Sequence, residues 1–286
     1  MSKTRTLPAR LGRLLVGLGF TELAAHEEVL TLPPHATLAA REIPLFVPAG
    51  GVKPDTPLLF ALDGQMMPAW KLAESLAVLA ERKEIVAPLV VAIPAAKERV
   101  EEYGLAGTLD YAGRGKLAAE FQTFVLADVL PAVRRRYGLK LAPERTGILG
   151  ASLGGLAAFD LAWHHPEVFG FVGVFSGSLW WRGEDGDAAA EQSSRLAHRL
   201  VRGTERPPAV RLWFQAGTAD ETDDRDGNGV IDAIQDTTEL IDELESKGYR
   251  RGRDVVYHEI AGGEHNERTW AEALPVFLRW ALPAKK

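Results

Sequence analysis

The stretch from Arg145 to Phe159 constrains the fold of this chain more than any other part of its sequence. A short apolar run leads into Gly150-Ala151-Ser152-Leu153-Gly154, and an alanine-rich segment with helical spacing follows. A G-x-S-x-G pattern between a strand and a helix is typical of a nucleophile elbow, which holds a reactive serine on a sharp, strained turn. The glycines remove Cβ atoms that would clash there. We therefore predict that Ser152 is a nucleophile; the alternative is an idle serine in a glycine-rich turn.

Apolar runs that alternate with helical segments predict the architecture. From residue 57 onward, runs such as 57–62 and 88–93 contain almost no polar residues, as in strands that are covered on both faces. Segments with helical periodicity separate these runs, and one of them, 116–137, contains Pro131, where we expect a kink or a break. The alternation predicts a mostly parallel central sheet with helices on both faces. Prolines between residues 29 and 47 favour antiparallel edge strands at the N-terminal side.

The length of 286 residues fits one large domain or two small ones. Because the sequence contains no repeat, low-complexity tract or linker, we predict a single domain over residues 29–286, with residues 1–28 as a segment packed on it. The basic start and the apolar residues 14–20 resemble a signal peptide, but that run is short and contains two glycines. We therefore expect a cytoplasmic protein.

Composition excludes several classes of function. A net charge of −6 argues against nucleic-acid binding, which normally requires a basic surface. No apolar run approaches the 18 or so residues of a membrane span. With no cysteine, the chain has no thiolate nucleophile and no cysteine-based metal site. A small-molecule partner is the remaining expectation, and the oligomeric state is not indicated.

The loops that follow two later strands contain an acid and a histidine in the order expected for a catalytic triad. Asp220 follows the predicted strand 210–215, and His265 follows the last predicted strand in a glycine-containing loop. The order Ser, Asp, His is that of α/β-hydrolases. We predict that His265 is the base and that Asp220 orients it, with Glu221 and Asp223 as alternative acids.

Two further groups are expected around the nucleophile. The oxyanion hole should use the backbone N–H of Leu153 and one from the loop after the first buried strand, that of Gln65. Trp180 and Trp181 are candidates for the wall of the substrate pocket, with core packing as the alternative.

An acidic loop after Asp220 matches the first nine positions of an EF-hand calcium loop, including the glycine at the sixth. Position twelve is Gln235 in place of glutamate, and no EF-hand helix precedes the loop. The alternative is a polar turn closed by Asx hydrogen bonds. A structural Ca²⁺ that stiffens the loop is expected, although no cofactor is required for the chemistry. The predicted ligands are Asp224, Asp226, Asn228, Val230 and Asp232.

Four separated motifs resemble those of the putative esterase family, which contains esterase D-like and enterochelin esterase-like α/β-hydrolases and also mycolyltransferases. They are residues 62–65, 150–155, 175–181 and 263–266. The resemblance extends from about residue 30 to the end of the chain. It implies an α/β-hydrolase fold and a serine carboxylesterase with Ser152 as nucleophile, His265 as base and an acid in the Asp220 loop.

The function predicted from these residues is cleavage of a carboxylic ester through an acyl-enzyme. The substrate class is that of a siderophore-esterase-like or a general esterase. An acyltransferase with the same site is one alternative. A calcium-dependent binding protein that keeps the fold without turnover is another.

Overall fold

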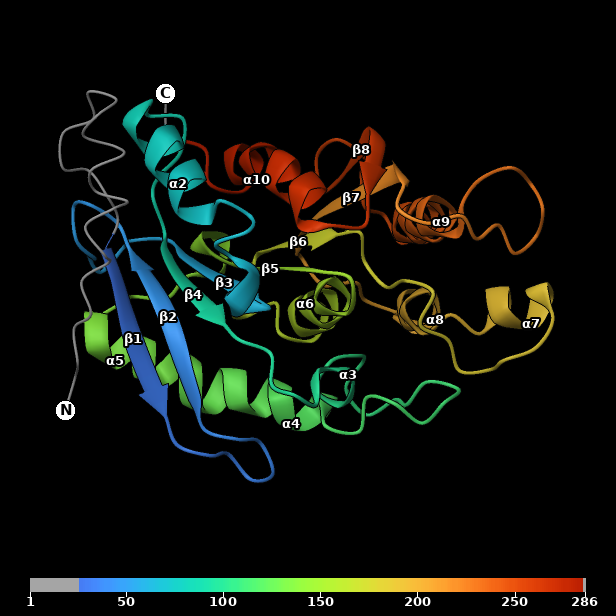
Figure 1. Cartoon of the computed structure of the whole chain (residues 1–286), viewed down its shortest axis with the longest axis horizontal. Helices are drawn as coiled ribbons and strands as arrows, with labels where there is room; N and C mark the ends of the chain where they lie inside the picture. The colour runs from blue at the N-terminus through green and yellow to red at the C-terminus, as the bar shows by residue number, and fades with distance from the viewer. Residues whose placement is uncertain (1–25, 285–286) are drawn as a thin grey trace.

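A computed structural model describes residues 26–284, which form one sheet of eight strands with helices on both faces (Figure 1). The strands are β1 (His26–Leu32), β2 (Arg41–Val47), β3 (Leu58–Leu62), β4 (Leu89–Ile93), β5 (Thr146–Ala151), β6 (Phe171–Phe175), β7 (Arg211–Ala219) and β8 (Val255–Glu264). Their spatial order is β1-β2-β4-β3-β5-β6-β7-β8. The pairs β1–β2 and β2–β4 are antiparallel, and all the other pairs are parallel. The predicted architecture is therefore confirmed.

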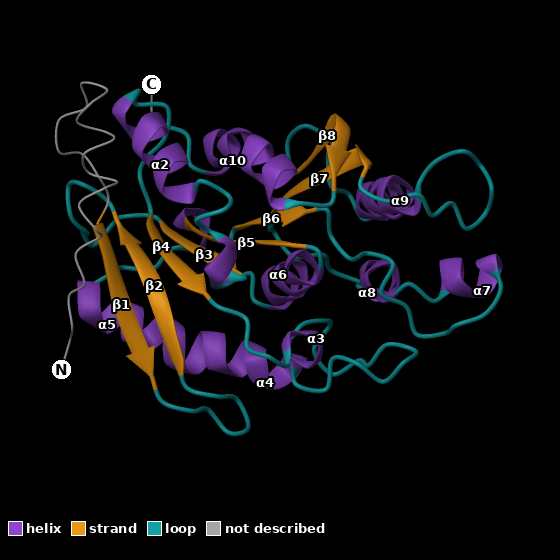
Figure 2. Cartoon of the chain, in the orientation of Figure 1, coloured by secondary structure: helices purple, strands orange, loops and turns teal. Residues whose placement is uncertain are grey.

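The helices lie in two layers, one on each side of the sheet (Figure 2). They are η1 (Gly64–Met66), α2 (Leu72–Glu81), α3 (Arg99–Glu102), α4 (Ala118–Thr123), η2 (Phe124–Val129), α5 (Leu130–Tyr137), η3 (Pro143–Arg145), α6 (Leu153–His164), α7 (Ala188–Ser193), α8 (Leu196–Gly203), α9 (Asp232–Ser246) and α10 (Glu267–Ala281). Helices α2 and α10 contribute to one hydrophobic core, and α4, α6, α8 and α9 contribute to the other. Because both faces are covered, every residue of β3, β4, β5 and β6 is buried. Within residues 26–284, no helix combines the length and the apolar character needed to cross a membrane.

The order of the strands decides where a ligand can bind. The chain forms β3 and β4 on one side of β5 and then continues through β6, β7 and β8 on the other. Loops that leave the carboxyl ends of β3 and β5 therefore diverge at a switch point, the usual position of a binding crevice in an open parallel sheet. The loops after β6, β7 and β8 begin at the same edge of the sheet, because these strands are parallel to β5. All five loops that contain the predicted site residues thus meet there.

Three elements differ from their sequence-based predictions. Strand β1 starts at His26, which pairs with Val47, so the domain begins before residue 29; the predictions for residues 1–25 fall outside the described part. The helix over 116–137 does not break at Pro131. A π-helical turn, η2, precedes the proline, which lies in the first turn of α5. Strand β8 includes the predicted glycine loop, since Glu264 pairs with Ala219 of β7. The two strands approach closely there: a Cβ on Gly217 would lie 2.2 Å from the carbonyl oxygen of Gly263.

Candidate active site

Ser152 occupies the turn between β5 and α6 with a strained backbone. Its φ of 56° and ψ of −127° lie in a region of backbone conformation that residues other than glycine rarely adopt. The turn is this tight because its neighbours are glycines: a Cβ on Gly150 would lie 2.3 Å from the carbonyl oxygen of Gly154. The local structure is that of a nucleophile elbow, with the serine at the start of a helix.

Two backbone N–H groups lie near this turn without a helical acceptor of their own. Leu153 is the first residue of α6, and Gln65 lies in the single turn of η1 after β3; N–H groups at such positions have no partner within their helix. The side chain of Gln65 accepts a hydrogen bond from the N–H of Ala95 (2.9 Å), which fixes the loop after β3. A Cβ on Gly64 would lie 2.2 Å from the oxygen of Ala92, so this loop lies directly against β4. These are the residues predicted to form the oxyanion hole.

Asp220 is buried at the end of β7 and is held by two hydrogen-bond donors. Its Oδ2 accepts from the N–H of Gly217 (3.1 Å), and its Oδ1 accepts from the hydroxyl of Ser176 (3.1 Å). Burial raises the pKa of Asp220, whereas these two hydrogen bonds and the nearby His265 lower it. The carboxylate therefore sits in a largely dry site that contains donors for its ionised form.

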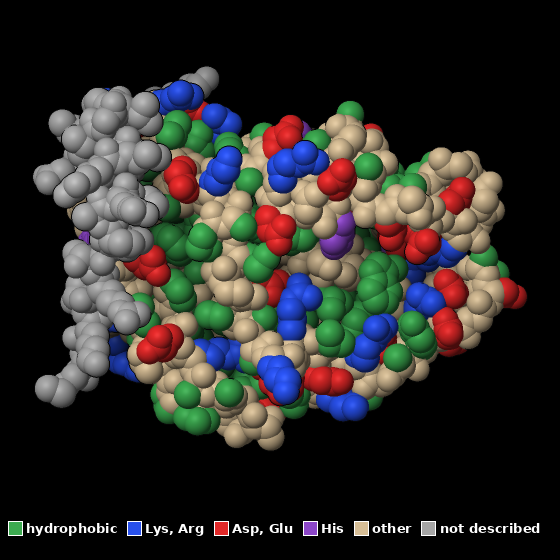
Figure 3. Space-filling view, viewed as in Figure 1, with side chains coloured by type: hydrophobic (Ala, Val, Ile, Leu, Met, Phe, Trp, Pro, Cys, Tyr) green, Lys and Arg blue, Asp and Glu red, His purple; other side chains and the backbone are tan. Residues whose placement is uncertain are grey.

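His265 follows β8 directly and lies beside the ring of Trp270, edge to face with centroids 5.3 Å apart. The imidazole is open to solvent on one side, but partial removal from water lowers its pKa. The charge of Asp220 raises that pKa, and the charge of Arg99 lowers it. A histidine with these neighbours can act as a base near neutral pH. The space-filling view shows one histidine side chain near the centre of this face (Figure 3).

The two alternative acids point elsewhere. Glu221 accepts a hydrogen bond from the N–H of Ala233, and burial together with the surrounding carboxylates raises its pKa to about 7. Asp223 is exposed. Of the three candidates, Asp220 is the one whose charge raises the pKa of His265.

An ion pair between Arg99 and Asp63, which no sequence motif indicated, lies on the other side of the site. Arg99 donates to both oxygens of Asp63, at 2.7 Å and 2.8 Å, and also approaches the carbonyl oxygen of Ala151 (3.4 Å). The N–H of Asp63 donates to the hydroxyl of Tyr103 (3.1 Å), and Asp63 adopts a left-handed backbone conformation. The ion pair therefore joins the loop after β3 to the residue before Ser152.

The loop after β6 lies against Ser152. The hydroxyls of Ser152 and Ser178 are 3.3 Å apart, and the N–H of Ser178 donates to the carbonyl oxygen of Ser152 (3.0 Å). Trp180 is half-buried, with the guanidinium of Arg114 5.5 Å from its ring centroid, so it remains a candidate wall. Trp181 is completely buried, which places it in the core in place of the pocket wall.

The predicted calcium loop is closed by its own hydrogen bonds. Asp224 accepts from the N–H groups of Asn228 (3.0 Å) and Gly229 (2.9 Å), and the side chain of Asn228 accepts from the N–H of Val230 (2.8 Å). Such Asx bonds are those expected for a polar turn. The structure brings no three Asp, Glu, His or Cys side chains together as a metal cluster among residues 26–284.

Asp226 and Asp232, two further predicted ligands, also have protein partners. Asp232 accepts from the N–H of Arg225 (3.0 Å) and pairs with its guanidinium (3.1 Å). Asp226 accepts from the amide of Gln235 (2.9 Å). Oxygens of both side chains are therefore already engaged by these donors.

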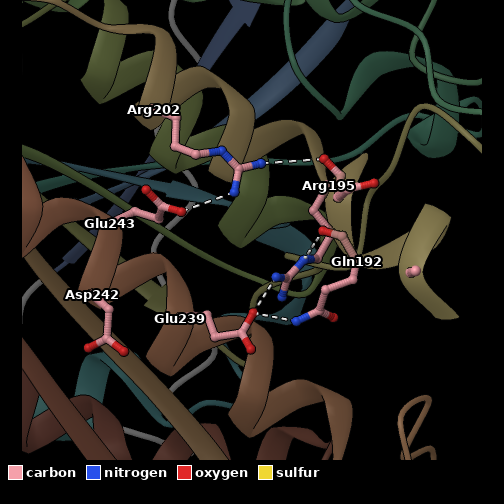
Figure 4. Close-up of a pocket in the computed structure, with 8 residues that line it drawn as sticks. Gln192, Arg195, Arg202, Glu239, Asp242 and Glu243 are labelled. Atoms are coloured by element: carbon pink, nitrogen blue, oxygen red, sulfur yellow. Dashed lines mark hydrogen bonds and ion pairs between the residues drawn. The ribbon is translucent and has the colours of Figure 1, made fainter.

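A pocket of about 570 Å³, whose lining contains none of Ser152, Asp220 and His265, lies where α7 and α8 face α9 (Figure 4). Arg202 pairs with Glu243 (3.0 Å), and Gln192 and Arg195 bond to Glu239. The charged groups here largely neutralise one another, and the lining contains no activated nucleophile. This pocket is therefore a weaker candidate for an active site than the region around Ser152.

Comparison with known proteins gives related enzymes. The family described as Putative esterase matches residues 38–281. An iron(III) enterobactin esterase of Escherichia coli (strain K12) is 29% identical over 182 residues, which are 62% of this chain and 41% of that protein. The chain thus spans about two fifths of the length of this relative.

Solved structures share the fold. An enterobactin esterase from Shigella flexneri, crystallised in the presence of 2,3-di-hydroxy-N-benzoyl-glycine, superposes with a TM-score of 0.69 and 22% identity, over 91% of this chain and 60% of that one. A CE1 ferulic acid esterase from Anaeromyces mucronatus gives a TM-score of 0.65 and 16% identity, over 90% of each chain. The fold is accordingly that of α/β-hydrolase esterases, as predicted. Since the family match covers most of the chain, the protein belongs to the putative esterase family.

Proposed function

We propose that this protein is a serine carboxylesterase that works through an acyl-enzyme. The observation that carries the proposal is the strained backbone of Ser152 at the carboxyl end of β5. The loops after β7 and β8 supply a buried carboxylate, Asp220, and a histidine, His265, at the same edge of the sheet. Membership of an esterase family supports the same chemistry.

In the proposed reaction, Ser152 Oγ attacks the ester carbonyl while His265 takes the hydroxyl proton. The ionised Asp220 holds the imidazole and stabilises its cationic form. The N–H groups of Leu153 and Gln65 donate to the oxyanion, which gains more from them than the ground-state carbonyl does. His265 then protonates the leaving alcohol. A water molecule, deprotonated by the same histidine, cleaves the acyl-enzyme and restores Ser152.

The proposed substrate is a small ester of the siderophore type, or a general carboxylic ester. The similarity to iron(III) enterobactin esterases supports a siderophore ester. Trp180 beside Arg114 offers an aromatic and cationic wall for a planar or anionic group. We keep the cytoplasm as the expected location.

A structural Ca²⁺ in the loop 224–235 remains part of the proposal. Binding requires Asp232 to turn from Arg225 and Gln235 to present its oxygen in place of its amide nitrogen. We expect Ca²⁺ to raise Tm and EDTA to lower it, with both effects lost in Asp224→Asn. Equal Tm and equal activity in Ca²⁺ and EDTA would show that the loop is a metal-free turn.

Hydrolysis of p-nitrophenyl esters of graded acyl length tests the proposed reaction. We expect turnover by the wild type and none above background for Ser152→Ala and His265→Ala. Ser194→Ala removes a buried hydroxyl that bonds only within the segment 184–194, so it should keep wild-type activity. Equal rates for the wild type and Ser152→Ala would refute the proposal.

A further inference from the structure

A chain of hydrogen bonds runs from α10 to the acid of the triad. The indole Nε1–H of Trp270 donates to Ser176 Oγ (2.9 Å), and that hydroxyl donates to Asp220 Oδ1 (3.1 Å). An indole nitrogen can only donate, so Ser176 Oγ must accept from it. The single proton of Ser176 is then directed away from the indole. Its other acceptor, the side-chain oxygen of Gln215, is farther away at 3.5 Å.

The three residues that these hydrogen bonds join are shielded from water. Ser176 is 3% exposed, and Trp270 and Asp220 are each 8% exposed. Ser176 has a φ of 41°, a conformation that costs energy for a residue other than glycine. Its carbonyl oxygen also accepts from the N–H of Ser152 (3.1 Å). One strained residue therefore contacts the acid through its side chain and the nucleophile through its backbone.

Trp270 contacts the third member of the triad as well. The edge-to-face contact with His265 lies on the same ring that donates to Ser176. Behind it, the ring of Trp70 lies with its centroid 5.5 Å away and limits movement of the indole. Trp270 therefore sets the position of the base by packing and the direction of the Ser176 hydroxyl by hydrogen bonding.

We propose that Ser176 and Trp270 are positioning residues for the triad: the indole orients the Ser176 hydroxyl, and that hydroxyl holds Asp220 as an ionised acceptor beside His265. The inference rests on the proposed esterase function. It assigns a role to Ser176 other than that of a nucleophile.

The proposal predicts a change in pH dependence when the hydroxyl is removed. The Ser176 hydroxyl lowers the pKa of Asp220, against the larger effect of burial. Without it, the Asp220–His265 pair takes up a proton more readily, so the acid limb of kcat/KM moves to higher pH. Among residues 26–284, the other charged or titratable groups that face this pair are Arg99 on α3 and Tyr257 on β8; both remain in the variants.

The test is a pair of variants with matched controls. Ser176→Ala should lower kcat about tenfold, leave KM within about twofold and move the acid limb up by about one pH unit, as expected for a lost hydrogen bond to a charged group. Trp270→Phe keeps a ring against His265 but removes the donor, so a smaller shift in the same direction is expected. The double variant should be no worse than Ser176→Ala, because the N–H acts through the hydroxyl.

The controls remove the same chemical groups elsewhere. Ser194→Ala deletes another buried hydroxyl, and Trp163→Phe deletes an indole N–H that donates to the hydroxyl of Thr204 (3.2 Å). Both should keep the wild-type pH profile.

The outcomes separate this inference from the proposed function. An active wild type with an unchanged pH profile and kcat in folded Ser176→Ala overturns the inference alone, as do fully additive effects in the double variant. A wild type without esterase activity overturns the proposed function and the inference with it. If Ser176→Ala does not fold, the pH profile of Trp270→Phe decides. An acid limb of kcat/KM at the wild-type pH in Trp270→Phe contradicts the proposed role of the indole N–H.

Discussion

Replacement of Gly150 by alanine should damage the elbow far more than the size of one methyl group suggests. The new Cβ would lie 2.3 Å from the carbonyl oxygen and 2.4 Å from the carbonyl carbon of Gly154, whereas ordinary contacts begin near 3.4 Å. Both atoms belong to the backbone, so no rotamer change relieves the clash. The start of α6 must move from β5 by about 1 Å. Overpacking of this kind costs about 3 kcal/mol, the upper end of the usual range.

The consequences can be measured as stability and as labelling. For a domain of this size, about 3 kcal/mol corresponds to a fall in Tm of roughly 6 °C or more. A displacement of about 1 Å at the nucleophile should also reduce the rate of fluorophosphonate labelling about 100-fold. Gly203→Ala is the matched control, because no atom lies within 4 Å of its Cβ and its backbone needs no positive φ. If Gly150→Ala unfolds at the wild-type Tm and labels at the wild-type rate, the backbone of this turn is not as tightly packed as the contact between Gly150 and Gly154 implies.

Three further changes test the electrostatics. Arg99→Met should move the acid limb of kcat/KM to higher pH, because His265 acts as a base only when neutral and the charge of Arg99 lowers the pKa of His265. Arg99→Lys keeps the charge and should stay nearer the wild type. An unmoved acid limb for Arg99→Met would count against an influence of Arg99 on His265. Glu221→Gln should raise Tm at pH 8 but hardly at pH 5, because the folded-state pKa of about 7 lies above the unfolded value of about 4.5 and stability is lost as pH rises between the two; an equal effect at both pH values would contradict this. Arg195→Met leaves the buried Asp236 with one cation fewer and should lower the free energy of unfolding by about 3 kcal/mol in urea titrations; a change below about 1 kcal/mol would show that the pair is not stabilising.

The parts of the fold that sequence could predict depend on local patterns. Buried strands such as 58–62 have no polar residues to place, and Gly150 is required by its contact with the backbone of Gly154, four residues later. Such features are written in short stretches of sequence, so strand order along the chain and the elbow could be inferred. The end of β8 could not, because the close approach of Gly217 to Gly263 depends on a neighbouring strand.

The supporting residues of the site were beyond sequence reasoning for the same reason. Ser176 and Trp270 are 94 residues apart, and neither lies in a motif that signals a contact with Asp220. Arg99 comes from an irregular stretch with no periodic pattern and reaches Asp63 only after folding. For Trp181 the sequence indicated a contact with the site that its complete burial does not support. A tryptophan beside a site motif is equally compatible with a pocket wall and with the core.

The proposed mechanism depends on Ser152 being an activated nucleophile, and intact mass after exposure to a fluorophosphonate measures this property. We expect one adduct per wild-type chain, no adduct on Ser152→Ala, and strongly slowed labelling of His265→Ala. Circular dichroism would show that each variant is folded. A folded wild type that gains no mass, or an Ser152→Ala variant that labels as fast as the wild type, would contradict the account.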